Sequence, residues 1–233
     1  MFDLLFMSLK AVFLDFSGVI IDDRAINQEL IADLLLNENL KADKDEYTQY
    51  CSGRSDRACL RDILANRDRI LSEEYLDKLV QTKARGYRQK VEQLTELPLA
   101  PHLLEFLMQL RQQNIVVGLV TGATRSEVEY VLQKVELAEY FDLTVAGDDL
   151  AQSKPEPDPY LLAVKNLKLQ PSECLAIEDN PVGIEAAKRA KIQVVGISYI
   201  YPLHMLQRKA NWTVDNFMEI ELDRVNRVLS QVS

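Results

Sequence analysis

Short, mostly apolar runs alternate with polar, helix-favouring stretches along the second half of the chain. Such runs occur at residues 115–120, 143–146, 174–177 and 194–197, with a further one at 11–14. Runs of this length bounded by turn signals are typical of strands buried in a parallel sheet. Helical spacing predicts helices at 101–113, 124–134, 158–168 and 181–190, and the tail from 214 to about 229 predicts a short strand and a last helix. The pattern therefore predicts an α/β fold, with a doubly wound parallel sheet covered by helices on both faces.

Residues 24 to about 93 interrupt this alternation, because they contain no convincing strand and are rich in helix-favouring residues. Apolar residues recur at helical spacing from Ile26 to Leu35, and Ser72 precedes a second long helical stretch. Two prolines, Pro98 and Pro101, then form a stiff connector. We therefore predict a Rossmann-like core domain made of 1–23 and 95–233, with a helical domain at 24–94 inserted after the first strand.

Residues suited to phosphoryl transfer follow four of the predicted strands. Asp15 follows the first, Thr121 the second, Lys154 the third after a turn, and Glu178 with Asp179 the fourth. In an open α/β sheet, ligands bind at the carboxyl ends of the strands. We therefore expect a carboxylate, a hydroxyl, an ammonium and a carboxylate pair to meet in one crevice.

Each of these residues also has an ordinary structural interpretation. Asp15 can cap a loop, Thr121 can be a helix N-cap, and Lys154 can be a solvated loop lysine. Glu178 and Asp179 can begin the next helix, where acidic side chains suit the helix dipole. Two adjacent carboxylates near a third nevertheless repel one another unless a cation lies between them, and Mg²⁺ suits an all-oxygen site.

The motifs together resemble the haloacid dehalogenase superfamily. They are Asp15-x-x-Gly18-Val19, Thr121-Gly122, Lys154-Pro155-x-Pro157-Asp158 and Glu178-Asp179-x-x-x-Gly183, in this order along nearly the whole chain. The place of the helical insertion resembles the branch with an α-helical cap, to which β-phosphoglucomutase and phosphoglycolate phosphatase belong. The segment 51–56 is similar to a cap loop that presents an arginine, here Arg54, to the substrate; a plain surface loop is the alternative.

The resemblance implies a role for each motif residue. Asp15 would attack phosphorus and form an aspartyl-phosphate. Asp15, the backbone carbonyl of Ser17 and Asp179 would hold Mg²⁺, with Glu178 nearby. The phosphorylated substrate would be bound by Gly18, Thr121, Gly122, Lys154 and Arg54.

One position departs from the superfamily pattern. Its phosphatases carry a second aspartate two residues after the nucleophile, where this chain has Ser17. General acid–base catalysis of the kind that aspartate supplies is worth roughly 10²–10⁴-fold, and a serine hydroxyl without an adjacent base cannot provide it. We therefore expect a Mg²⁺-dependent hydrolase of a small phosphorylated metabolite that is weak on ordinary monoesters.

Two alternatives remain open. The protein can be a phosphate-binding or regulatory protein that has lost turnover, or an enzyme for an easy leaving group such as an acyl phosphate or a phosphonate. Phosphonate cleavage needs a cap lysine that forms a Schiff base, and nothing in the sequence marks one. The candidates in the insertion are Lys41, Lys44, Lys78, Lys83 and Lys90.

Composition limits the partners and the location. The net charge of −9 argues against nucleic acid and anionic membrane surfaces. No apolar stretch approaches the length of a membrane span, and residues 1–7 lack the basic region of a signal peptide. The cysteines, at positions 51, 59 and 174, show no pairing pattern, which favours a reducing cytoplasm. We expect a cytoplasmic monomer or homodimer.

Overall fold

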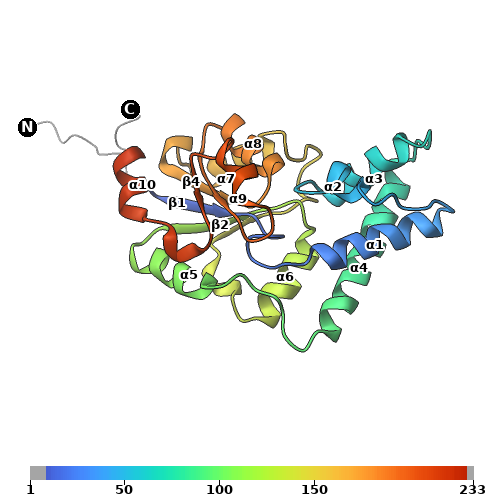
Figure 1. Ribbon diagram of the computed structural model, residues 1–233, viewed down its shortest axis with the longest axis horizontal. Coiled ribbons are helices and arrows are strands. Elements are labelled where there is room, and N and C mark those ends of the chain that lie inside the picture. Colours follow the sequence, from blue (N-terminus) through green and yellow to red (C-terminus); the bar gives the residue numbers. More distant parts are fainter. Residues whose placement is uncertain (1–8, 230–233) are drawn as a thin grey trace, which may run out of the picture.

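The computed structural model describes residues 9–229, in which six parallel strands form one sheet in the order β3-β2-β1-β4-β5-β6 (Figure 1). The strands are β1 (Ala11–Leu14), β2 (Val116–Val120), β3 (Leu143–Val145), β4 (Cys174–Glu178), β5 (Gln193–Ile197) and β6 (Trp212–Val214). The predicted doubly wound α/β fold is confirmed. The strand order reverses beside β1, which is where such sheets bind their ligands.

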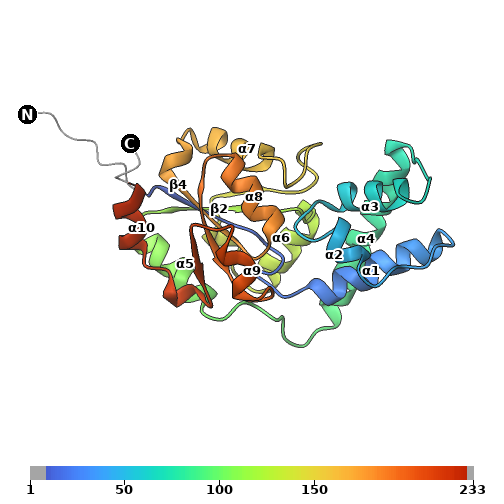
Figure 2. The ribbon, with the colours of Figure 1, turned by 45° about the horizontal axis from the view of Figure 1, so that its top comes forward.

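Helices cover both faces of the sheet, as Figures 1 and 2 show. One face carries α5 (Leu103–Gln112) and α6 (Arg125–Lys134), and the other carries α7 (Asp158–Leu167) and α8 (Pro181–Arg189). Successive side chains of a strand point to opposite faces. Val12 and Leu14 accordingly join the apolar core under α5 and α6, and Ala11 and Phe13 join the one under α7 and α8. Two short C-terminal helices, α9 (Leu203–Gln207) and α10 (Leu222–Leu229), complete the layers, of which α9 was not predicted.

Four helices of the predicted insertion gather beyond the carboxyl ends of the strands (Figure 1, right). They are α1 (Arg24–Asn37), α2 (Glu46–Tyr50), α3 (Asp56–Ala65) and α4 (Glu73–Gln93), and we call them the helical segment. They share an apolar core of their own. The Tyr75 backbone N–H donates to Ser72 Oγ at 3.2 Å, so Ser72 caps α4 as predicted. The exact division of the chain into two domains stays a prediction.

The two chain crossings that reach the helical segment are hydrogen-bonded to each other. The Asp22 N–H donates to the Pro98 carbonyl at 2.9 Å, and the Ala100 N–H donates to the Ile20 carbonyl at 2.9 Å. Ile21 and Leu99 form an antiparallel bridge between these bonds. The segment is therefore joined to the sheet by a narrow two-stranded connection.

The pairing of the cysteines corrects the sequence analysis. Cys51 and Cys59 form a disulfide that joins the end of α2 to α3, with their Cα atoms 4.5 Å apart. The interpretation that no cysteines pair is wrong, because the turn between α2 and α3 brings these two together. Cys174 is free and buried on β4. The cytoplasmic location therefore loses the support that the cysteines gave it.

Helices long and apolar enough to cross a membrane are absent from residues 9–229. The prediction about a signal peptide concerns residues 1–7, which lie outside the described residues.

Candidate active site

Three buried carboxylates meet where β1 and β4 end. Leu14 is in register with Ile177, so Asp15 and Glu178 leave the sheet side by side. The Asp15 N–H continues the ladder by donating to the Ile177 carbonyl at 3.1 Å. One carboxylate oxygen from each of Asp15, Glu178 and Asp179 lies within 4.8 Å of the others. The structure thus brings together the three acidic residues that the sequence analysis singled out.

Lys154 lies in this carboxylate cluster with its side chain only 1% exposed. Its Nζ is 3.2 Å from Asp15 Oδ1 and 2.6 Å from Glu178 Oε1, and it donates to the Val120 carbonyl at 2.8 Å. Burial lowers the pKa of the ammonium, but Asp15 and Glu178 outweigh that effect and leave its pKa raised. A single protonated lysine therefore faces three carboxyl groups.

Tyr160 is a member of the cluster that the sequence analysis missed. Its hydroxyl donates to Glu178 Oε1 at 2.5 Å, and its ring is completely buried. Tyr160 lies within α7, where an aromatic residue in an amphipathic pattern indicates only packing. No signal in the sequence could have assigned it to the site.

The carboxyl groups of Glu178 and Asp179 hold their protons more tightly than usual. Burial raises the pKa of Glu178 to about 8, against the opposing effect of Lys154. Burial, reinforced by Asp15, raises the pKa of Asp179 to about 7. The second oxygen of Glu178, Oε2, is buried and has no hydrogen-bond partner among residues 9–229. Crowded carboxylates with an unpartnered oxygen fit a divalent cation that prefers oxygen ligands, such as Mg²⁺.

The loop after β1 folds back onto Asp179. Gly18 has a φ of +85°, and a Cβ at this position would collide with the Asp179 carboxylate, so both its conformation and its surroundings require glycine. The Phe16 N–H donates to Asp15 Oδ1 at 2.8 Å. The loop therefore holds Ser17 beside the cluster, as the motif predicts.

Asn180 holds the Asp179 carboxylate through a hydrogen bond. Its Nδ2 donates to Asp179 Oδ1 at 2.7 Å, while its own Oδ1 accepts the N–H groups of Val182 and Gly183 at the start of α8. The sequence analysis missed Asn180. An asparagine directly before Pro181 is a recognisable N-cap signal and could have placed it here.

Thr121 and Gly122 follow the last residue of β2, the strand beside Asp15, because Leu14 is also in register with Leu119. The Thr121 hydroxyl accepts the Ala123 N–H at 3.1 Å, so it organises the turn into α6. A Cβ at Gly122 would collide with the carbonyl group of Arg54, which shows how closely the helical segment approaches this turn. Contacts of Thr121 and Gly122 with a phosphate group stay a prediction.

The Arg54 side chain is not joined to the carboxylate cluster. Its Nη1 donates to the Tyr50 carbonyl at 3.2 Å, and its Nη2 lies 2.7 Å from Asp62 Oδ2. Both partners belong to the helical segment. A substrate contact through the Arg54 guanidinium therefore stays a prediction.

Ser17 has a carboxylate neighbour that the sequence analysis missed. Its hydroxyl donates to Asp23 Oδ2 at 3.2 Å, and the Tyr87 hydroxyl donates to the same oxygen at 2.7 Å. Burial raises the pKa of Asp23 to about 6, partly offset by these hydrogen bonds. The interpretation that Ser17 lacks an adjacent base is therefore wrong. The chain turns sharply between β1 and α1, and this turn could not be read from the pattern.

Lys83 links the helical segment to α6, which packs on the sheet. Its side chain is 3% exposed, and its Nζ lies 3.0 Å from Glu127 Oε1 on α6 and 3.1 Å from Asp56 Oδ2 on α3. Burial lowers the pKa of Lys83, but the two carboxylates outweigh that effect and raise it above its ordinary value. The lysine is therefore protonated at neutral pH.

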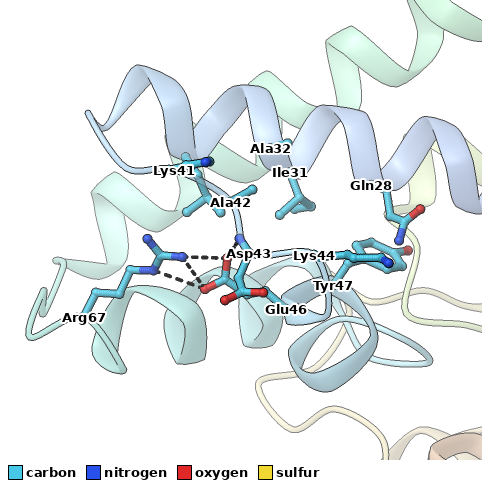
Figure 3. Close-up of a pocket in the computed structure, with 11 residues that line it drawn as sticks. Gln28, Ile31, Ala32, Lys41, Ala42, Asp43, Lys44, Glu46, Tyr47 and Arg67 are labelled. Carbon is cyan, nitrogen blue, oxygen red and sulfur yellow. Dashed lines mark hydrogen bonds and ion pairs between the residues drawn. The ribbon is translucent and has the colours of Figure 1, made fainter.

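Two pockets lie in the helical segment or at its border with the strand ends. The larger, about 740 Å³, lies within the helical segment and contains the ion pair between Glu46 and Arg67 (Figure 3). No predicted site residue lines it. The smaller, about 230 Å³, lies between the helical segment and the strand ends, and Gly122, Thr124 and Asp56 line it. Of the predicted phosphate-binding residues, Gly122 lines the smaller pocket, and Asp15, Lys154, Glu178 and Asp179 line neither.

The fold and the arrangement of these residues agree with the family that the chain matches. The model of the haloacid dehalogenase-like hydrolases matches residues 12–197, which include the whole carboxylate cluster. The chain belongs to this family.

Relatives with assigned activities include two kinds of phosphatase. Phosphoglycolate phosphatase from Shigella boydii serotype 4 (strain Sb227) is 33% identical over 151 residues, which are 64% of this chain and 59% of that protein. Validoxylamine A 7'-phosphate phosphatase from Streptomyces hygroscopicus subsp. limoneus is 29% identical over 192 residues, 81% of this chain and 85% of that protein. The chain thus spans about three fifths of the phosphoglycolate phosphatase.

Solved structures confirm the fold. β-Phosphoglucomutase from Clostridium difficile superposes with a TM-score of 0.83 at 23% identity, covering 96% of this chain and 98% of that one. CbbY from Rhodobacter sphaeroides, solved in complex with phosphate, superposes with a TM-score of 0.80 at 21% identity, covering 91% and 96%. At these identities the likeness concerns the fold alone.

Proposed function

We propose that the protein is a Mg²⁺-dependent phosphohydrolase that transfers the phosphoryl group of a small phosphorylated metabolite to Asp15 and then to water. The observation that carries this proposal is the buried cluster of Asp15, Glu178 and Asp179 around Lys154 at the strand ends. Asp15, Asp179 and the carbonyl of Ser17 would hold Mg²⁺, with Glu178 nearby. The ion would supply positive charge to the phosphoryl oxygens.

The contacts of Asp15 select one of its oxygens as the nucleophile. Oδ1 accepts the Phe16 N–H and lies 3.2 Å from Lys154 Nζ, so two donors hold it. Oδ2 is left for attack on phosphorus, and the leaving oxygen departs with the bonding electron pair. Water then attacks the phosphorus of the aspartyl-phosphate and frees the Asp15 carboxylate.

The close approach of the helical segment to the turn after β2 supports a small substrate. The Arg54 carbonyl group packs directly against Gly122, and the pocket beside Gly122 is about 230 Å³. In this proposal the helical segment acts as a cap over the bound substrate. The relatives act on phosphoglycolate and on validoxylamine A 7'-phosphate, as their names state. Two such different leaving groups support a phosphorylated metabolite as the class, without fixing the compound.

One observation favours acyl phosphates over alkyl esters as substrates. Ser17 supplies no carboxyl group directly at the position from which family phosphatases protonate the leaving group. A carboxylate leaving group needs no such proton. Of the five candidate lysines for phosphonate cleavage, Lys83 is unsuited, because a Schiff base requires a neutral amine and the Lys83 pKa is raised. A cytoplasmic location and a monomer or homodimer stay predictions.

The proposal is tested by phosphate release from an acyl, an aryl and an alkyl phosphate, with Mg²⁺ and with a chelator. We expect release to require Mg²⁺ and to fall in that order of substrates. Asp15→Asn removes the nucleophile and should abolish release, whereas Asp22→Asn makes the same change at an exposed aspartate and should not. Release by Asp15→Asn at the rate of the unmodified protein would overturn the proposal and favour a binding protein.

A further inference from the structure

Ser17 is partly exposed to solvent, although the rest of the loop directly after β1 is buried. Its neighbours Asp15, Phe16 and Gly18 are buried, whereas Ser17 is partly exposed. Gly18 is packed against Asp179, and Asp15 is held by Lys154. Among residues 15–18, Ser17 is therefore the one that solvent can reach.

The hydrogen bond to Asp23 fixes the direction of that hydroxyl. A serine hydroxyl has one proton to donate and two lone pairs to accept with, whereas a carboxylate oxygen only accepts. Ser17 donates to Asp23 Oδ2 at 3.2 Å, so its lone pairs are left for another donor. Water is a donor of that kind.

Asp23 is itself held in place by two helices of the helical segment, α4 and α1. The side chain is 1% exposed, and its Oδ2 also accepts the Tyr87 hydroxyl of α4 at 2.7 Å. The Asn27 side chain donates to the Asp23 backbone carbonyl at 3.2 Å, which anchors the residue to the first turn of α1. The helical segment therefore sets the position of Asp23, and the hydrogen bond from Ser17 joins it to the loop after β1.

We propose that Asp23 is a positioning residue which, through Ser17, orients the water that hydrolyses the aspartyl-phosphate on Asp15. The inference rests on the proposed function, because it concerns the second step of that reaction. The water oxygen bonds to phosphorus, the bond from phosphorus to Asp15 Oδ2 breaks, and its electron pair returns to the carboxylate. Both protons of the water leave with the phosphate as dihydrogen phosphate. Ser17 accepts a hydrogen bond from the water and donates one to Asp23, Asp23 only accepts, and neither residue gains or loses a proton.

The test separates the two steps by loading Asp15 from acetyl phosphate with Mg²⁺ and then following loss of the phosphoryl group after dilution. Misplacing a reacting group by about 1 Å costs on the order of 10²-fold in rate. We therefore expect Ser17→Ala and Asp23→Ala each to slow dephosphorylation by about 10²-fold, with little change in loading. The double variant should lose no more than either single variant, because the two residues act as one unit.

Conservative and matched variants exclude a merely structural role. Asp23→Asn keeps a carbonyl acceptor for the Ser17 hydroxyl and should recover most of the dephosphorylation rate. Asp22→Ala, at the exposed neighbouring position, should behave like the unmodified protein. The melting temperature of each variant shows whether it folds. A variant that does not fold is replaced by Tyr87→Phe, which removes the second hydrogen-bond donor to Asp23. Tyr87→Phe should also slow dephosphorylation without slowing loading.

Several outcomes would overturn the inference. They are equal slowing of loading and dephosphorylation, multiplicative losses in the double variant, and an Asp23→Asn rate as low as that of Asp23→Ala. Failure of the unmodified protein to load Asp15 at all would instead remove the proposed function. The two failures are therefore distinguishable.

Discussion

At the scale of single residues, the site is defined by an imbalance of charge. Lys154 contacts Asp15 and Glu178, while Asp179 is held by the neutral side chain of Asn180. Burying an ionised carboxylate without a full counter-charge is costly, so burial favours the protonated form of these groups. The raised pKa values of Glu178 and Asp179 follow from this.

We expect this imbalance to make the stability of the metal-free protein depend on pH. The folded protein keeps the protons of Glu178 and Asp179 up to about pH 8 and pH 7, whereas the unfolded chain releases them near the ordinary values of 4.5 and 3.8. The folded state therefore binds more protons, and the free energy of unfolding contributed by these groups falls as pH rises through this range. Mg²⁺ competes with the same protons, so its stabilising effect should grow with pH.

Thermal melting with Mg²⁺ and with a chelator, across that pH range, measures this difference. Asp179→Asn should remove most of the Mg²⁺ effect, and Asp22→Asn should leave it in place. A Mg²⁺ effect that is constant with pH, or one that survives in Asp179→Asn, would contradict the account of the cluster.

At the scale of elements, the sequence predicts what depends on neighbours along the chain. Strands buried on both faces give continuous apolar runs, and the residues after them lie at the ligand-binding edge of the sheet, which is why Asp15 and Glu178 could be placed in advance. Tyr160 and Asp23 enter the site through the packing of α7 and the turn before α1. Those contacts depend on tertiary packing, which periodicity does not encode.

The junction between α4 and α6 is an element-scale contact that can be tested alone. Lys83→Met would leave the buried carboxylates of Asp56 and Glu127 facing each other without their cation. Breaking a buried ion pair costs about 3–5 kcal/mol. We expect the variant to melt at a lower temperature and to have a larger radius of gyration in small-angle scattering, because the helical segment is held less firmly.

Lys78→Met is the matched control on the same helix. Lys78 forms an exposed pair with Glu74 at 2.8 Å, and such pairs contribute only about 0.3–0.5 kcal/mol. Scattering and melting of this control should match the unmodified protein. If Lys83→Met also matches the unmodified protein in melting temperature and radius of gyration, the ion pairs of Lys83 do not hold the helical segment in place.

At the scale of the whole molecule, the topology places the chemistry between two bodies of packed residues. The sheet side supplies Asp15, which is the proposed nucleophile, the acidic pair and the lysine. The helical segment supplies Tyr87 and the backbone that packs against Gly122. The motifs predicted the first set, because those residues follow strands. They could not predict the second set, because its contacts form only when the segment lies on the sheet.

The most direct test of the central claim is to locate the phosphoryl group on the protein. The protein is incubated with acetyl phosphate and Mg²⁺, quenched in acid, digested and measured by peptide mass spectrometry. We predict one phosphoryl group on Asp15, absent when a chelator replaces Mg²⁺ and absent in Asp15→Asn. Turnover of acetyl phosphate with the group on another residue, or with Asp15 never modified, would contradict the account.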